Sequence, residues 1–310
     1  MNISIVIPCY NSKNSLPELV KRLKSTLQTS LLEIIFINDG SSDDTWNVIQ
    51  KLQDEYTEVK GLNLMKNFGQ HSALFCGINH ASGDVVVTMD DDLQNPPEEI
   101  LPMLNKLEED SEIDVVIGVP KEPRKSLVRK LGSNYLNYIT SKILDKPAAL
   151  RMASFRVMRR RLVDEIKTNQ TANPAFGSLL LNYTRNIVNI EVKNNERKYG
   201  ESGYSLRKSI RLFLNNVLNN STLPLRIASN IGISSSFVGL ILAGFFLFKH
   251  LTGEIVVPGW TSLIVIMLFF FGLILFSLGV IGEYLIRILT EVNHSRQYVV
   301  KAKVGFGNNE

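Results

Sequence analysis

Two long stretches without a charged residue, both in the last third of the chain, most constrain its fold. They are Ile227–Phe248 and Thr261–Gly282, and each has about the length that spans the hydrocarbon core of a bilayer. Helices that are apolar on every face are uncommon in domains of this size. The pattern therefore predicts transmembrane helices at 227–248 and 261–283, joined by a short non-cytoplasmic loop at 249–260. A buried helix pair is the alternative.

Basic residues flank the two predicted spans. Those before the first span are Arg207, Lys208, Arg211 and Arg226, and those after the second are Arg287, Arg296, Lys301 and Lys303. Basic residues favour the cytoplasmic side, so we expect residues 1–204 and the tail 284–310 in the cytoplasm, with the chain in the cytoplasmic (inner) membrane. Residues 205–226 alternate apolar and basic side chains, which is typical of a helix at the membrane interface. A helix packed on the preceding domain is the alternative.

Residues 1–204 have the pattern of an α/β domain. Short β-branched runs alternate with stretches whose apolar residues are spaced by three and four, and such repeats predict a mostly parallel sheet covered by helices. The predicted strands are 1–8, Glu33–Asn38, Val85–Met89 and Asp114–Val119, and the clearest helices are Leu16–Leu27 and Thr45–Leu52. Ligands of such sheets bind beyond the carboxyl ends of the strands.

Composition excludes several classes of protein. The net charge is only +4 over 310 residues, which does not indicate a nucleic-acid partner. The two cysteines, Cys9 and Cys76, support neither a disulfide framework nor a zinc site. The chain has no G-x-G-x-x-G after the first strand and no Gly-Lys-Ser/Thr after Gly40, so a dehydrogenase or a kinase is disfavoured.

A run of three acids, Asp90-Asp91-Asp92, follows the predicted strand Val85–Met89. Adjacent carboxylates repel one another unless a cation lies among them. Two carboxylates one residue apart, with the amide oxygen of Gln94, suit Mg²⁺ or Mn²⁺. Alternatively, Asp92 or Asn95 caps the helix that starts near Pro96, but capping accounts for one acid and not for three.

Three motifs now carry a resemblance. Ser4–Asn11, Ile37–Thr45 and Asp90–Glu98 together resemble a family 2 glycosyltransferase of the GT-A fold. The chain as a whole, tail included, resembles the polyprenyl-phosphate glycosyltransferases. These include dolichyl-phosphate mannose synthase, bactoprenol glucosyltransferase and undecaprenyl-phosphate 4-deoxy-4-formamido-L-arabinose transferase.

The resemblance implies roles for individual residues. Asp90 and Asp92 match the family's metal-binding aspartates, with Gln94 as a further ligand of Mg²⁺ or Mn²⁺. The residues that match the nucleotide-sugar pocket are Pro8, Tyr10, Asn11, Asp39, Lys66, Gly69 and Asp91. The residues that resemble the lipid-phosphate site are Arg124, Arg129, Ser133, Arg197 and Ser202. Of these, Arg197 resembles an arginine that closes over the phosphate and is counted as catalytic with Asp90 and Asp92. For each arginine the alternative is a solvated surface charge.

The sequence departs from the family pattern in three places. Ser12 replaces the usual Glu, Gly203 replaces the usual Lys, and Leu150 or Arg151 stands where an Asp often precedes Phe155-Arg156. These departures put in doubt the ribose contact, one phosphate contact and the recognition of the sugar hydroxyls. His71 has two interpretations, a contact to the donor sugar and a structural histidine at a helix start.

The function that this implies is an inverting transfer of a sugar from a nucleotide-diphosphate sugar, with UDP expected, to undecaprenyl (polyprenyl) monophosphate at the membrane. The product would be a lipid-linked sugar for the cell envelope. Residues 173–178 contain no acid to act as a base, and a phosphate acceptor needs none because it is already an anion. The alternatives are an enzyme with a glycan or diphospholipid acceptor, and a non-enzymatic membrane subunit. The related enzymes suggest a homo-oligomer such as a tetramer, and residues 296–301 are expected to form a strand that pairs with a neighbouring subunit.

Overall fold

The computed structural model describes residues 1–121, 147, 149–169, 176–195, 259–292 and 297–307, and a few single positions between 230 and 252. The chain divides into two compact units. The α/β unit comprises Met1–Ser205 together with His294–Glu310, and the helical unit comprises Leu206–Asn293.

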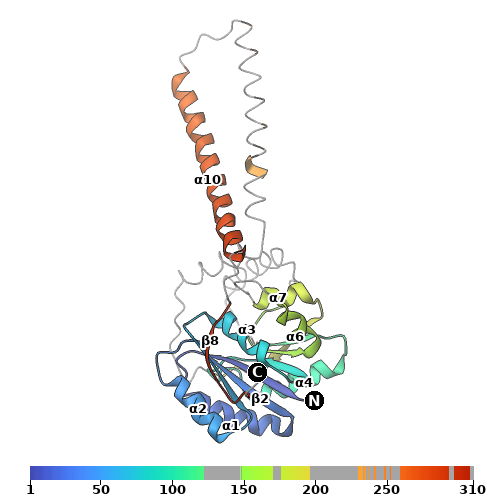
Figure 1. Ribbon diagram of the computed structural model, residues 1–310. Coiled ribbons are helices and arrows are strands. Elements are labelled where there is room, and N and C mark those ends of the chain that lie inside the picture. Colours follow the sequence, from blue (N-terminus) through green and yellow to red (C-terminus); the bar gives the residue numbers. More distant parts are fainter. Residues whose placement is uncertain are drawn as a thin grey trace. The chain divides into compact units, whose positions relative to one another are not determined.

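The described elements of the α/β unit appear in Figure 1. In chain order they are β1 (Ile3–Cys9), α1 (Leu16–Leu27), η1 (Gln28–Ser30), β2 (Leu31–Asn38), α2 (Thr45–Glu55), β3 (Val59–Leu64), α3 (Gln70–His80), β4 (Val85–Thr88), η2 (Pro97–Glu99), α4 (Ile100–Glu109), β5 (Val115–Pro120), β6 (Arg156–Arg159), α6 (Arg160–Lys167), α7 (Phe176–Tyr183), β7 (Ile187–Val192) and β8 (Val300–Val304).

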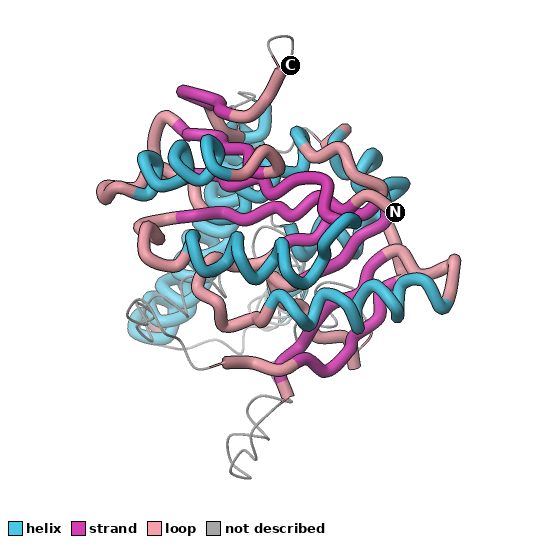
Figure 2. The backbone as a smooth tube through the Cα atoms, turned by 90° about the horizontal axis from the view of Figure 1, so that it is seen from below, coloured by secondary structure: helices cyan, strands magenta, loops and turns pink. Residues whose placement is uncertain are grey.

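The described strands form one eight-stranded sheet in the order β7-β5-β6-β4-β1-β2-β3-β8. The pairs β1–β2, β1–β4, β2–β3 and β5–β7 are parallel, whereas β6 runs antiparallel to both of its neighbours and β8 runs antiparallel to β3. The expected α/β architecture with a mostly parallel sheet is confirmed, and Figure 2 shows helices on both faces of it.

Each face of the sheet has its own apolar core. Helices α1, α2 and α4 cover one face, where Leu19, Met103 and Ile5 of β1 belong to one cluster of buried side chains. Helices α3, α6 and α7 cover the other face, where Phe75 packs with Val6. Successive residues of a strand point to opposite faces, and β1 is buried along its whole length. This burial explains its nearly unbroken apolar sequence.

The expected strands at the start of the chain, near 33–38, near 85–89 and near 114–119 are all present, as are both expected helices. Three strands were not expected. β3 contains Lys60, Gly61 and Asn63 in six residues, which obscures its pattern. β6 and β7 are short strands of mixed polarity, and the antiparallel insertion of β6 between β5 and β4 cannot be inferred from periodicity.

The tail strand requires a correction. A strand was expected within residues 296–301 and was assigned to pairing with a neighbouring subunit. It forms at Val300–Val304 and pairs instead with β3 of the same chain, with Leu62 opposite Lys303. Asn79 on α3 also donates a hydrogen bond to the hydroxyl of Tyr298 (2.9 Å). The edge of β3 that β2 leaves open is therefore covered by the tail of the same chain, and β8 becomes the edge strand of the described sheet.

The best-described part of the helical unit is α10 (Trp260–Val292), a helix of 33 residues drawn in orange to red in Figure 1. Large apolar side chains are exposed along it, and Leu275 is 69% exposed. Among the described residues, no helix combines the length and apolar character that crossing a membrane requires. The expected span 227–248 lies mostly outside the described residues.

Candidate active site

The loops after β1, β2 and β4 meet at one edge of the sheet, as expected from the parallel arrangement of these strands. Asn11 has a positive φ of 56°, and its backbone N–H donates a hydrogen bond to the hydroxyl oxygen of Ser41 (3.0 Å). The side-chain oxygen of Asn11 accepts from the backbone N–H of Ser42 (2.9 Å). Pro8 lies within β1 opposite Ile37, and Tyr10, in the loop after β1, is 52% exposed.

Asp39 holds the loop that precedes α3. Its two carboxylate oxygens accept hydrogen bonds from the backbone N–H groups of Phe68 (2.7 Å) and Gly69 (2.9 Å). Burial raises the pKa of Asp39, and these two hydrogen bonds oppose the rise. Lys66, in the same loop, lies over the ring of Phe68. The structure therefore brings together Asp39, Lys66 and Gly69, which were all expected in the nucleotide-sugar pocket. The two hydrogen bonds from the loop to Asp39 were not indicated by the sequence.

The contact between the two loops is close. Gly40 has φ +65°, and a Cβ atom there would lie 2.5 Å from the backbone nitrogen of Asn67. Only glycine has both the conformational freedom and the small volume that this position needs.

Asp90 is held by two side chains that the sequence analysis did not single out. Gln70, the first residue of α3, donates to one carboxylate oxygen (2.7 Å), and Ser154 donates to the other (2.5 Å). Burial raises the pKa of Asp90, and the nearby charge of Asp92 adds to that rise. No pattern in the sequence marks Ser154, because it precedes β6 and meets Asp90 only through the pairing of β6 with β4.

Asp91 points to a different partner. The hydroxyl of Ser12 donates to its carboxylate. The pKa of Asp91 is raised to about 6, first by burial and then by the charges of Asp90 and Asp92, against the opposing effect of the Ser12 hydrogen bond. The residue that departs from the family pattern at position 12 thus lies against the acid at position 91.

Asp92 accepts a hydrogen bond from the backbone N–H of Gln94 (3.1 Å). The backbone carbonyl of Gln94 in turn accepts from the N–H of Asn195, beyond β7. The helical turn η2 has no side-chain cap, so the alternative in which Asp92 or Asn95 caps that helix is wrong. The described residues contain no group of three or more His, Cys, Asp and Glu side chains gathered as metal ligands.

A buried arginine lies on the same side of the sheet as Asp90. Arg156, the first residue of β6, is 5% exposed and lies over the ring of Phe176 at 5.2 Å. Burial lowers its pKa to about 10, and the charge of Asp90 opposes that change. The pKa of His71 is lowered by burial and, to a smaller extent, by Arg156. The sequence does contain a signal for this residue, because a charged side chain stands between Phe155 and Val157 in a buried strand. The Phe155-Arg156 motif was noted from the sequence, but no role was assigned to the arginine.

The expected lipid-phosphate residues cannot be compared with this geometry. They lie outside the described residues and are Arg124, Arg129, Ser133, Arg197 and Ser202.

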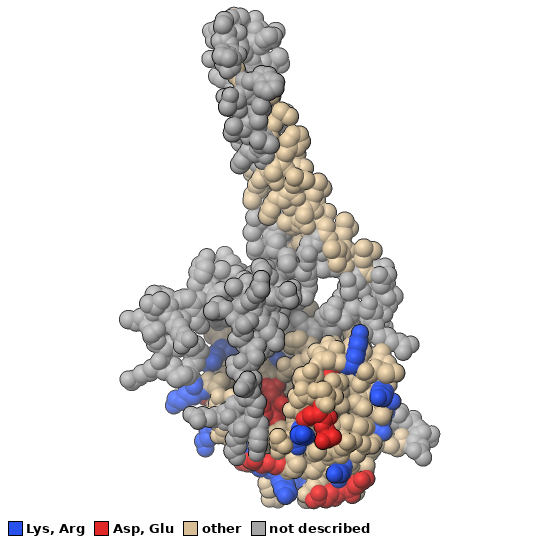
Figure 3. Space-filling model, turned by 90° about the vertical axis from the view of Figure 1, so that its left-hand side faces the viewer, with Lys and Arg blue, Asp and Glu red and all other residues tan. Residues whose placement is uncertain are grey.

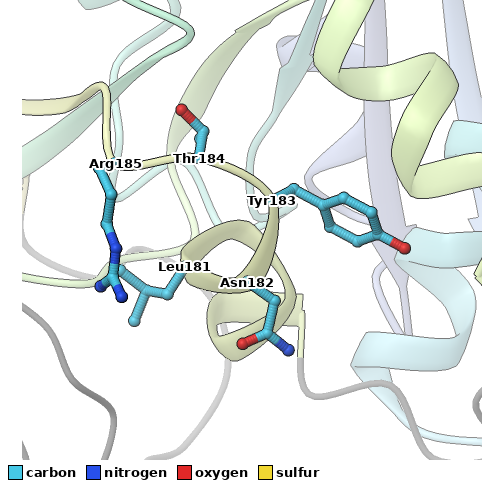
Figure 4. A pocket seen from close by; sticks show the side chains of 5 residues that line it. All are labelled: Leu181, Asn182, Tyr183, Thr184 and Arg185. Atoms are coloured by element: carbon cyan, nitrogen blue, oxygen red, sulfur yellow. The ribbon is translucent and has the colours of Figure 1, made fainter.

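A separate pocket lies at the end of α7 (Figure 4) and is lined by Leu181, Asn182, Tyr183, Thr184 and Arg185. Thr184 donates a hydrogen bond to Asp114 (2.5 Å), the residue just before β5. The pocket is therefore at the amino end of the parallel strands, opposite the carboxylate cluster, and contains none of the expected site residues. On the face shown in Figure 3, basic and acidic side chains of the α/β unit are interspersed.

The fold and this site define a class. A doubly wound sheet whose polar and acidic side chains gather beyond the carboxyl ends of its strands has the arrangement of a nucleotide-binding α/β enzyme.

Comparisons with known proteins identify the family. The model of the family described as glycosyl transferase family 2 matches residues 4–167. The chain is 32% identical over 307 residues to a Bacillus subtilis (strain 168) protein described as uncharacterized glycosyltransferase YkcC, with 98% of this chain and 95% of that protein covered. The chain belongs to glycosyltransferase family 2, and its α/β unit fits the GT-A fold.

Solved structures share the fold at low identity. Two are of glucosyl-3-phosphoglycerate synthase from Mycobacterium tuberculosis. The complex with phosphoglyceric acid is 16% identical, with a TM-score of 0.51 and coverage of 71% of this chain and 80% of that chain. The complex with Mn²⁺ and UDP-glucose is 17% identical, with a TM-score of 0.50 and coverage of 70% and 77%.

Proposed function

We propose that this glycosyltransferase moves a sugar from a nucleotide-diphosphate sugar, UDP being the expected nucleotide, to the phosphate of undecaprenyl or another polyprenyl monophosphate at the cytoplasmic face of a membrane. One observation carries the proposal. A family 2 domain with three partly buried carboxylates beyond β4 is joined, in the same chain, to a 33-residue helix whose large apolar side chains are exposed. Such a helix would be stable in a lipid bilayer, and an acceptor with a long apolar chain would meet the enzyme at the surface of that bilayer.

The donor would bind over the loops after β1 and β2. The exposed ring of Tyr10 offers a surface for stacking, and the loop from Lys66 to Gly69 is held against Asp39 by two hydrogen bonds. A related fold in complex with UDP-glucose, that of the Mycobacterium tuberculosis synthase, supports UDP as the nucleotide. We assign Pro8, Asn11 and Asp91 to the same pocket.

A divalent cation, Mg²⁺ or Mn²⁺, fits the carboxylates of Asp90 and Asp92, with Gln94 as a further oxygen ligand. The fit rests on charge. The two acids lie close enough for Asp92 to raise the pKa of Asp90, and hard oxygen donors of this kind are the preferred ligands of both metals. When bound, such an ion would neutralise charge on the diphosphate leaving group.

The membrane segments are proposed from the sequence. We assign an interfacial segment at 205–226 and spans at 227–248 and 261–283, with residues 1–204 and 284–310 on the cytoplasmic side. The exposure of Phe271, Leu275 and Phe276 on α10 supports a lipid environment for the second span, because exposed side chains of this size are unfavourable in water.

The chemistry would be a direct displacement with inversion. An oxygen of the acceptor phosphate forms a bond to the anomeric carbon, and the bond from that carbon to the donor's β-phosphate oxygen breaks, releasing the nucleoside diphosphate. The acceptor is already an anion at neutral pH, so the protein must position it rather than deprotonate it. We assign the positioning of the lipid phosphate to Arg124, Arg129, Ser133, Arg197 and Ser202.

The test is transfer of label into the organic phase. The purified chain would be incubated with undecaprenyl phosphate, Mg²⁺ or Mn²⁺, and a panel of labelled UDP- and GDP-sugars. We expect metal-dependent transfer of one sugar, lost in Asp92→Ala and kept in Asp54→Ala, which removes an exposed acid on α2. Normal transfer by Asp92→Ala would refute the metal site. Donor hydrolysis without transfer to the lipid would refute the acceptor.

A further inference from the structure

Arg156 is a cation inside the core that the proposed chemistry does not yet use. It begins β6, where it pairs with Thr88 of β4 on one side and Ile117 of β5 on the other. Its neighbours Phe155 and Val157 point into the core under α1 and α4, whereas Phe176, which lies under the guanidinium, belongs to the core on the opposite face. The arginine therefore points toward the face that carries α3 and α7.

Among the residues that the structure describes, the Arg156 guanidinium lacks the partners that a buried charge requires. Its Nε and Nη1 atoms are buried and have no hydrogen-bond partner among the described residues. Burying a charged group without hydrogen bonds is strongly unfavourable. The charge of Asp90 acts on the arginine, but the hydrogen bonds that Asp90 accepts come from Gln70 and Ser154 and not from Arg156.

Another arginine of the same strand shows the contacts of a structural role. Arg159, three residues further along β6, donates to the backbone carbonyls of Leu107 (2.5 Å), Asp110 (3.2 Å) and Ile113 (2.7 Å). Its charged group is thus satisfied by the protein itself. Arg156 has the opposite arrangement, because its Nε and Nη1 find no acceptor in the described part of the chain.

The surroundings of Arg156 suit an incoming anion. Gly177 of α7 lies next to Arg156. Even a Cβ atom added to this glycine would remain 4.0 Å from Nη2 of Arg156. Asp90, the proposed metal ligand, is near enough for its charge to act on the arginine. A substrate whose phosphate bound a metal ion at Asp90 would therefore come close to Nε and Nη1 of Arg156.

We propose that Arg156 binds a phosphate group of the substrate beside Asp90. A phosphate offers several negatively charged oxygens, so it can satisfy separate N–H donors and the charge together, which a sugar hydroxyl cannot do. The phosphate has two possible sources, the diphosphate of the donor and the monophosphate of the acceptor. This inference rests on the proposed function for the identity of those two substrates.

The experiment compares Arg156→Met with Arg159→Met in the full chain. Thermal unfolding is measured without ligand, and binding is measured by calorimetry with UDP plus Mn²⁺ in one arm and farnesyl phosphate in the other. For Arg156→Met we expect an unchanged or higher Tm, because an unsatisfied buried charge is removed, and binding weakened about tenfold or more in one arm. The weakened arm identifies the source of the phosphate. Arg159→Met should lower Tm and leave both affinities unchanged.

Several outcomes would overturn the inference. A lower Tm for Arg156→Met with both affinities intact would make the residue structural, and so would equal weakening of binding by the two variants. Arg156→Lys, which keeps the charge with fewer donors, should bind with intermediate affinity. Because binding needs no turnover, a loss of affinity in Arg156→Met would stand even if transfer to the lipid failed, and in that case only the acceptor assignment would fall.

Discussion

A buried ion pair at the end of the sheet opposite the carboxylate cluster allows a quantitative prediction. The carboxylate of Glu33 on β2 is fully buried and lies 2.8 Å from the ammonium of Lys60 on β3. It also accepts hydrogen bonds from the hydroxyl of Ser4 (2.6 Å) and from the backbone and hydroxyl of Ser82 (2.8 Å each). We expect Lys60→Met to destabilise the α/β unit, because it leaves a buried carboxylate without its counter-ion.

The size of the loss of stability depends on the interactions that Glu33 keeps in Lys60→Met. Removing one partner of a buried pair costs about 3–5 kcal/mol. The side chain of Lys60 is 23% exposed and three hydrogen bonds to Glu33 persist, so we expect about 2 kcal/mol. That loss corresponds to a decrease in Tm of about 4–8 °C for a unit of this size.

The pH dependence has a definite sign. Lys60 and the serine hydrogen bonds outweigh burial and lower the pKa of Glu33 below its ordinary value of 4.5. A lowered pKa stabilises the fold above the unfolded value, and that stability is lost as the pH falls through the folded value. The difference in Tm between wild type and Lys60→Met should therefore be full at pH 7 and should shrink below about pH 4.5.

The control is an exposed pair with the same geometry. Lys106 and Glu109 on α4 are 2.7 Å apart, with side chains 41% and 61% exposed, and Lys106→Met should change stability by less than about 0.5 kcal/mol. Thermal unfolding of the full chain, followed by tryptophan fluorescence, measures both variants. Adding Glu33→Gln to Lys60→Met should recover part of the loss. Equal losses of stability in Lys60→Met and Lys106→Met would refute the reasoning. So would a difference in Tm between wild type and Lys60→Met that does not change with pH.

Three further predictions concern the site and the tail. Gly40→Ala should lower stability by about 2–4 kcal/mol and weaken UDP binding in calorimetry, since its Cβ would meet the backbone of the facing loop at 2.5 Å; an unchanged Tm would contradict that contact. Ser154→Ala should reduce transfer about tenfold while Tm stays within about 1 °C, because it removes a donor that orients Asp90; full activity would show that Gln70 alone suffices. Tyr298→Phe should lower stability by about 1 kcal/mol through loss of the hydrogen bond from Asn79, and proteolysis of the tail should become faster if that bond helps to hold β8.

The sequence predicted those elements whose apolar pattern is strong. β1, β2, β4 and β5 and the helices α1 and α2 were all expected, and α1 has the expected bounds. β3 was missed because a lysine, a glycine and an asparagine interrupt its apolar residues. β8 was expected as a strand, but its partner was not foreseen, because an edge strand carries no information in its own sequence about which edge it will join.

For the site, the sequence predicted which side chains gather and not what each one touches. Parallel strands place their carboxyl ends at one edge, so Asn11, Asp39 and Asp90 were expected at that edge, and the strand order β4-β1-β2 makes them neighbours there. The hydrogen bonds from Ser12 to Asp91 and from Ser154 to Asp90 join residues 79 and 64 positions apart. Such distances along the chain are bridged only by the order of strands in the sheet.

The sequence by itself determined the family of this protein, its α/β pattern and the acidic cluster after β4, because these are properties of local runs of residues. Only the tertiary structure decided that β6 enters the sheet antiparallel, that Asp90 is held by Gln70 and Ser154, and that Arg156 lies buried without a hydrogen-bond partner among the described residues. The physical reason is that burial and pairing depend on packing between segments distant in sequence, and a single residue's type does not reveal which of its hydrogen bonds the folded chain will satisfy.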